Sequence, residues 1–102
     1  MFARVARYEV PDDRLEDAGA AFGRAGEEIK HLDGFAGGYV LIDSEDGRML
    51  TLTLWENLAT LESSEHAAGS ARRQAAEAAG GNVLSVEKFE VAHSLAAQPS
   101  SV

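Results

Sequence analysis

The chain opens with an alternation of side chains over residues 2–10. One face of this segment carries Phe2, Arg4, Ala6, Tyr8 and Val10, and the other carries Ala3, Val5, Arg7 and Glu9. A period of two is typical of a β-strand. After Pro11, Asp13 and Glu16 have the spacing of a capping box, so the sequence predicts that a helix starts at Asp13.

Apolar residues then recur at helical spacing and predict an amphipathic helix that reaches about Ile29; they are Leu15, Ala18, Phe22, Ala25 and Ile29. Gly19, Gly23 and Gly26 lie beside this stripe. Each glycine inside a helix costs about 1 kcal/mol relative to alanine. We favour close approach of a second helix or of the sheet as the reason for them, and space for a ligand is the alternative.

The second half of the chain repeats the scheme with one more strand. The pattern predicts a loop over residues 32–38, a strand over 39–43, a hairpin turn over 44–47 and a strand over 48–55. Asn57 is a good N-cap for a helix that runs to about Ala79, where Gly80 and Gly81 end it. Residues 82–92 alternate again and predict the last strand.

The order strand-helix-strand-strand-helix-strand predicts an α+β fold of the ferredoxin-like, βαββαβ type. Right-handed crossovers place both helices on one face of a four-stranded antiparallel sheet. The third and fourth strands are apolar on both faces, so a second layer is expected, and another copy of the chain supplies it most simply. We therefore expect a homodimer through the open sheet face, with one domain over residues 1–92 and a loose tail over 93–102.

Composition narrows the function classes. The net charge is -8 and the pI is near 4.7, which argues against nucleic acid or an anionic membrane as a partner. No apolar stretch is long enough to span a bilayer, and the first seven residues carry arginines, unlike a signal peptide. Because the chain has no cysteine, thiol chemistry and zinc–thiolate sites are excluded. A cytoplasmic protein that uses no cofactor and no metal is the expectation.

The single tryptophan marks a candidate pocket. Trp55 ends the third strand and shares a face with Thr51 and Thr53, where a flat organic molecule could bind. Plain core packing at a strand end is an equal alternative. Tyr39 and Phe22 are further candidate walls of such a pocket.

The second predicted helix carries charged residues and many alanines. With Leu61 as the centre of its buried stripe, Glu65 and Arg72 fall near the buried side, at a pocket mouth or on a kinked, exposed helix. His66 falls about 140° away with solvent-facing residues, so a solvated histidine is favoured over a ligand or base. Small side chains such as Ala68 leave volume against the sheet unless aromatic residues fill it, which is compatible with a cavity or with a closely packed helix.

Three short motifs carry a likeness to a known family. They are Asp33–Phe35 with Gly38 and Tyr39, Leu52–Glu56, and Leu61 with Glu62. The chain resembles the antibiotic biosynthesis monooxygenase type of the dimeric α/β-barrel superfamily. The resemblance implies a homodimer with a pocket between the helices and the sheet of each subunit.

The family includes cofactor-independent monooxygenases of polyketides or quinols and haem-degrading enzymes. In the polyketide-oxidising members the strand-end tryptophan is paired with an asparagine and a tyrosine, where this chain has Thr51 and Leu61. Haem-degrading members resemble one another in an asparagine on the first strand, which is missing over residues 2–10. The companions of Trp55 therefore differ from those of the best-known members.

Three hypotheses follow. The first is a cofactor-free oxygenase of a small electron-rich aromatic, with Trp55 and Tyr39 as pocket walls, Arg72 holding an anion and His66 as the fallback base. Its substrate contacts would be Phe22, Tyr39, Thr51, Thr53, Leu61 and Ala68. The second is a non-catalytic dimeric module that binds a small apolar ligand or mainly assembles. The third is haem degradation.

Overall fold

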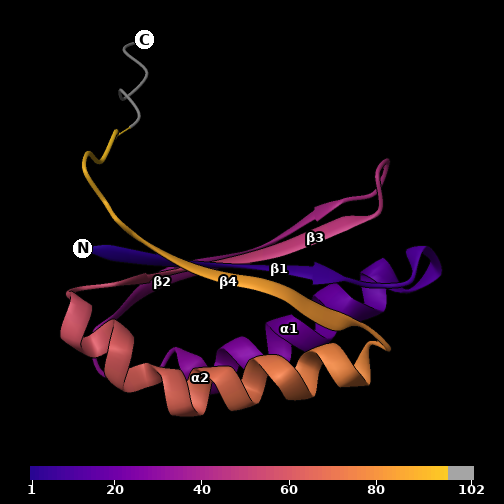
Figure 1. The fold of residues 1–102 in the computed structure, drawn as a ribbon, viewed down its shortest axis with the longest axis horizontal. Coiled ribbons are helices and arrows are strands. Elements are labelled where there is room, and N and C mark those ends of the chain that lie inside the picture. The colour runs from indigo at the N-terminus through magenta and orange to yellow at the C-terminus, as the bar shows by residue number, and fades with distance from the viewer. Residues whose placement is uncertain (97–102) are drawn as a thin grey trace, which may run out of the picture.

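The computed structural model describes residues 1–96 and follows the predicted order of elements. The elements are β1 (Phe2–Glu9), a short 3-10 helix η1 (Asp12–Arg14), α1 (Leu15–Ile29), β2 (Phe35–Asp43), β3 (Arg48–Trp55), α2 (Leu58–Ala78) and β4 (Asn82–Glu90). The sheet is antiparallel with the strand order β2-β3-β1-β4. Both helices cover the same face of it, as Figure 1 shows. The predicted ferredoxin-like fold is confirmed.

The first helix starts differently from the prediction. The segment after Pro11 is a 3-10 turn, closed by a hydrogen bond that the backbone N–H of Arg14 donates to the carbonyl of Pro11 over 2.8 Å. Arg14 then stands at the N-cap of α1, without a capping side chain. The predicted capping box of Asp13 and Glu16 is therefore wrong, because Asp13 already lies within the turn.

The second strand starts four residues earlier than predicted. β2 begins at Phe35, and its pairing with β3 is irregular between Phe35 and Gly37, which has φ 134°. Glycines have no side chains to alternate, so the pattern missed this part of the strand. The turn over 44–47 and the Asn57 cap are confirmed, since the N–H of Thr60 donates to Asn57 Oδ1 over 2.8 Å.

The fourth strand ends at Glu90, two residues before the predicted end. The predicted loose tail, residues 93–102, lies in part outside the described residues, and the boundary at residue 92 stays a prediction. No helix within residues 1–96 combines the length and the apolar character needed to cross a membrane.

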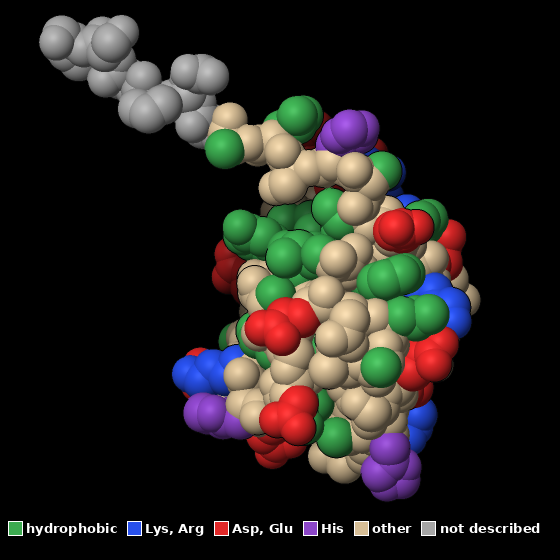
Figure 2. All heavy atoms as spheres, turned by 90° about the vertical axis from the view of Figure 1, so that its left-hand side faces the viewer, with side chains coloured by type: hydrophobic (Ala, Val, Ile, Leu, Met, Phe, Trp, Pro, Cys, Tyr) green, Lys and Arg blue, Asp and Glu red, His purple; other side chains and the backbone are tan. Residues whose placement is uncertain are grey.

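The two faces of the sheet differ in what covers them. Tyr8 of β1, with Met49 and Trp55 of β3, is buried on the helix side, where the ring centroids of Tyr8 and Phe22 lie 4.4 Å apart. On the other face lie Tyr39, 64% exposed, and Phe89, 49% exposed. Figure 2 shows hydrophobic side chains gathered in the upper half of its view, on the side of the sheet that the helices leave bare.

Candidate functional site

A cavity of about 310 Å³ lies between the two helices and the sheet. Its walls come from β1, α1, β2, β3 and α2. The polar lining residues include Arg4, Tyr8, Thr51, Thr53 and Arg72, and the apolar ones include Phe22, Ala25, Ile29, Phe35, Val40 and Ala68. A volume near 300 Å³ with a mostly apolar wall and a few polar groups is typical of a site for a small organic ligand.

The cavity exists because the alanines of α2 face the sheet and few aromatic residues fill the space. Ala68 lines the cavity, and the aromatic side chains that line it from the core side are Tyr8, Phe22 and Phe35. Tyr39 and Phe89, which could have filled it, pair with Leu52 and Ala3 on the opposite face. Of the two sequence interpretations of the alanine-rich helix, a cavity and close packing, the structure shows a cavity at Ala68.

Arg72 is the buried cation of this cavity. The residue is 8% exposed, and its Nη1 donates to Glu65 Oε1 over 3.1 Å. This is the one hydrogen bond of its guanidinium among the described residues, and no fully buried side-chain nitrogen or oxygen among them lacks a partner. Its other guanidinium nitrogens are therefore not fully buried, and the residue lines the cavity. The structure places Arg72 at the pocket, as one of the two sequence interpretations expects.

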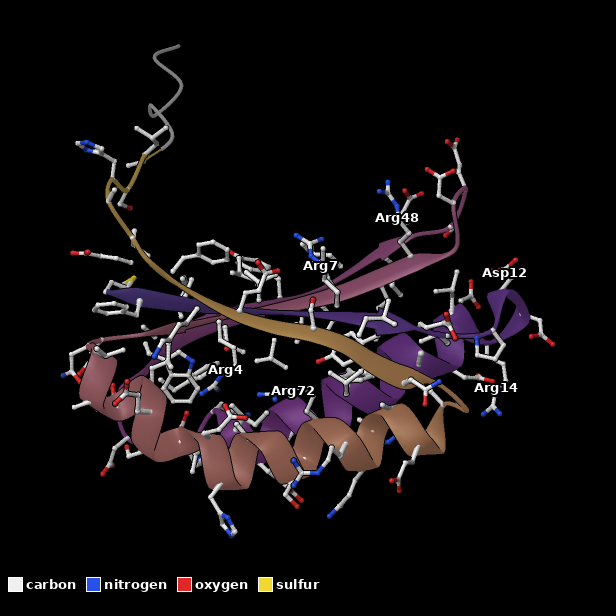
Figure 3. The ribbon with its side chains drawn as sticks, in the orientation of Figure 1. Arg4, Arg7, Asp12, Arg14, Arg48 and Arg72 are labelled. Atoms are coloured by element: carbon white, nitrogen blue, oxygen red, sulfur yellow. The ribbon has the colours of Figure 1, made fainter. Side chains whose placement is uncertain are left out.

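Arg4 is a second buried arginine, which the sequence interpretation passed over. Its Nη2 lies 2.7 Å from the carbonyl oxygen of Leu61, 3.2 Å from Ser64 Oγ and 2.8 Å from Glu65 Oε2. Burial lowers the pKa of Arg4, and the charge of Glu65 partly opposes this shift. Figure 3 shows Arg4 and Arg72 between the sheet and α2, while Arg7 lies on the other side of the sheet.

The signal for Arg4 was present in the sequence. It occupies a position of β1 whose alternating neighbours, Ala6 and Tyr8, are buried against the helices. A charge at such a position requires a partner or a cavity. Here Glu65 serves both arginines, so the group carries one net positive charge in a chain of net charge -8. An arginine on the strand face that is predicted to be buried is thus the sequence signal that indicates this cluster.

Tyr8 adds a buried hydroxyl to the cavity. Its oxygen lies 2.8 Å from Thr51 Oγ1, and its ring packs on Phe22. Burial raises the pKa of the Tyr8 phenol, although the Thr51 bond and the charges of Arg72 and Arg4 act in the opposite direction. The hydroxyl therefore stays protonated at neutral pH and can donate a hydrogen bond to a ligand.

Trp55 stands behind the cavity and does not line it. Its side chain is completely buried, and its indole N–H donates to Thr53 Oγ1 over 3.0 Å. Phe35 meets the indole edge-on at 5.5 Å, and the guanidinium of Arg4 lies 5.5 Å from the ring centroid. Trp55 thus holds three residues that do line the cavity, while it makes no part of the wall itself.

The remaining sequence candidates divide into two groups. Phe22, Thr51, Thr53 and Ala68 line the cavity. Leu61 is buried beside Arg4 but lies outside this cavity, and His66 is exposed on α2 and takes no part in the wall.

Tyr39 lies at the cavity margin, with its side chain largely exposed. Within residues 1–96, no group of three or more histidine and carboxylate side chains converges as a metal site would require.

Comparisons with known proteins give one matching family and several solved structures of similar fold. The family model described as antibiotic biosynthesis monooxygenase matches residues 1–78. A Deinococcus radiodurans protein described as a putative antibiotic biosynthesis monooxygenase superposes with a TM-score of 0.76 at 14% identity, over 97% of this chain and 100% of its own. No curated protein matches the chain.

Two further solved structures are similar. Rv0793 from Mycobacterium tuberculosis superposes with a TM-score of 0.71 at 14% identity, over 93% of this chain and 98% of its own. SnoaB, a cofactor-independent oxygenase from Streptomyces nogalater, gives 0.71 at 15% identity, over 92% of this chain and 95% of its own. At these identities the likeness establishes the fold alone.

Proposed function

We propose that this chain, which belongs to the antibiotic biosynthesis monooxygenase family, is a cofactor-independent monooxygenase of a small electron-rich aromatic. The observation that carries the proposal is Arg72, a cation more than nine-tenths buried that lines a mainly apolar cavity. A buried positive charge beside an apolar wall favours a flat molecule in its anionic form, such as a phenolate or an enolate.

The chemistry needs no external reductant. In a substrate of the anthrone type the reacting carbon is a methylene between two aryl groups, and loss of one of its protons gives a carbanion that is also an enolate. The carbanion forms a C–O bond to molecular oxygen, and the resulting peroxide anion takes up a proton. The hydroperoxide then loses water, because its O–O bond breaks and the second methylene proton leaves with the departing hydroxide. One methylene and one oxygen molecule thus give one carbonyl and one water, and the substrate supplies all four electrons.

The residues of the cavity support the first of these steps. An opposite charge within a few ångströms lowers the pKa of an acid. The net positive charge of the group formed by Arg4, Arg72 and Glu65 therefore promotes loss of the substrate proton to solvent at the cavity mouth. Tyr8, protonated and buried, is placed to donate a hydrogen bond to the substrate oxygen. In this scheme His66, the base suggested from the sequence, takes no part.

Oxygen uptake tests the proposal. Wild-type protein is supplied with anthrone and with a simple quinol, and its rate is compared with the uncatalysed rate. Arg72→Gln removes the cation but keeps a shorter polar amide, and Arg73→Gln is the matched control, because Arg73 is the exposed neighbour on the same helix. We expect at least a tenfold loss of rate for Arg72→Gln and a change below twofold for Arg73→Gln. Absence of uptake with both substrates would refute the activity.

The second candidate function is non-catalytic binding of the same class of ligand. It is favoured by the placement of Trp55 behind the cavity and of His66 outside it, since neither can touch a bound substrate. Calorimetry with anthrone under nitrogen separates the two candidates. Binding that depends on Arg72 without any oxygen uptake in air would support the module and exclude the enzyme.

We also propose that the protein is a homodimer through the bare face of the sheet. The support is the exposure of Tyr39, Leu41 and Phe89, which are 64%, 46% and 49% exposed on a face without helices. An apolar sheet face of this kind is unfavourable in water and is covered by a second sheet in many small proteins. A two-fold axis through the face would bury the same residues of both copies.

A further inference from the structure

Gly23 and Gly26 are the two glycines of α1 that no packing contact explains. A Cβ built at either position meets no atom within 4 Å. Their φ angles are not positive, so the backbone does not require glycine there. Alanine would make the helix more stable at both positions. The favoured sequence interpretation, close approach of another element, is therefore wrong for these two residues.

Two other glycines show what a packing reason looks like. At Gly19 a Cβ would lie 2.8 Å from Cδ1 of Ile42, and at Gly38 it would lie 3.0 Å from the carbonyl oxygen of Leu52. At Gly38 the backbone of the neighbouring strand leaves no room for a side chain, and at Gly19 the tip of Ile42 would have to move aside. Gly23 and Gly26 differ, because they face open space and both line the cavity.

The cavity has a polar inner part and a glycine-lined outer part. Arg72 and Tyr8 form the inner part, because both line the cavity and are buried, 8% and 4% exposed. Gly23 and Gly26 lie one turn apart on α1 and form the outer part, because Gly23 is exposed and Gly26 half-buried, and the exposed Glu27 and Lys30 line the cavity beside them. A ligand whose oxygen meets the inner donors therefore extends its hydrocarbon part toward the two glycines.

We propose that Gly23 and Gly26 determine ligand size: they keep room under α1 for a second and a third fused ring. The ligand is accordingly a fused-ring phenol or enol, with its oxygen at Arg72 and Tyr8 and its far rings beside the glycines. The inference rests on the proposed function only in so far as the cavity binds an aromatic hydroxyl compound. It holds for an oxygenase and for a binding module alike.

A ligand series with one hydroxyl and a growing ring system tests the proposal. Phenol, 2-naphthol and 2-anthrol are titrated by calorimetry under nitrogen into wild type, Gly23→Leu and Gly26→Leu. Ala20→Leu is the matched control, because Ala20 is an exposed position of α1 outside the cavity wall. We expect each glycine variant to lose at least tenfold in affinity for 2-naphthol and 2-anthrol while phenol changes less than twofold. The control should change none of them.

Thermal unfolding supplies an independent readout. Because the glycines have no packing role, Gly23→Ala and Gly26→Ala should each raise Tm by about 4–8 °C, the shift that one helix-propensity step gives in a domain of this size. Ala20→Gly should lower Tm by a similar amount. A lower Tm for the alanine variants would overturn the inference, because it would reveal a packing role.

The binding outcomes separate two failures. If wild type binds the series but the leucine variants lose affinity equally for all three ligands, or for none, the size inference fails and the proposed ligand class stands. If wild type binds none of the three compounds, the proposed function fails and the inference fails with it.

Discussion

Replacement of Arg4 by methionine is the substitution that tests the buried cluster most directly. Methionine keeps an unbranched apolar stem and removes the guanidinium. Three groups then lose a partner: the carbonyl of Leu61, the hydroxyl of Ser64 and the carboxylate of Glu65. Ser64 keeps its own bond to the Leu61 carbonyl, which therefore retains one donor.

The magnitude follows from these contacts. A hydrogen bond that involves a charged group contributes about 1.5–3 kcal/mol, and breaking a buried ion pair costs about 3–5 kcal/mol. The side chain of Glu65 is 49% exposed and keeps Arg72, so water and the second arginine reduce the ion-pair part. We therefore expect Arg4→Met to lower the free energy of unfolding by about 3 kcal/mol, a large fraction of the roughly 5–15 kcal/mol typical of a domain.

Urea unfolding followed by Trp55 fluorescence is the assay, at one protein concentration because self-association would add to the apparent stability. Arg24→Met is the matched control, since Arg24 is exposed on α1, and it should stay within about 0.5 kcal/mol of wild type. Arg4→Lys should fall between them, because an ammonium can keep the charge but not the planar fork. A loss below about 1 kcal/mol for Arg4→Met would refute the reasoning that this cluster ties β1 to α2.

Three further outcomes are expected. Burial raises the pKa of Glu65, but the hydrogen bond from Arg72 and the nearby arginines outweigh it and hold this pKa below its ordinary value of 4.5. The carboxylate therefore stabilises the fold at pH values above 4.5, and this contribution is lost as the pH falls through the lowered pKa. Glu65→Gln should accordingly flatten the acid limb of a Tm–pH profile. Phe89→Glu on the bare sheet face should convert a dimer into a monomer in sedimentation velocity at micromolar concentration, and a monomeric wild type would refute the dimer. Asn57→Ala should cost about 1 kcal/mol in urea unfolding, since it removes the bond that caps α2 at Thr60.

The sequence predicted the order of helices and strands well, because the side chains of β1, β3 and β4 alternate between two faces and such alternation is typical of a β-strand. It failed where local chemistry was ambiguous. The capping-box spacing of Asp13 and Glu16 was overridden by the 3-10 turn after Pro11. The start of β2 was hidden because glycines show no alternation, so Phe35 was taken for a loop residue.

The candidate site was predicted less completely, for a physical reason. Helical phase alone places Arg72 near the buried side, but only the three-dimensional structure shows that Glu65 binds it together with Arg4 from a strand 61 positions away. Contacts between distant segments are not encoded in periodicity. The same limit applies to Trp55, whose phase on β3 was right and whose distance from the cavity could not be read from the sequence.

The buried arginines themselves argue for a binding role over a purely structural one. Two buried cations that share a half-exposed carboxylate are a poor way to stabilise a small domain, since apolar residues of similar volume are often at least as stabilising. The wall around them is mainly apolar, and both glycines in it reduce the helix propensity of α1. Stability alone would favour filling this space with larger apolar side chains. A mainly apolar cavity with a buried cation in its wall fits the proposed recognition of an aromatic anion, and Trp55 supports that wall through its contacts with Thr53 and Arg4.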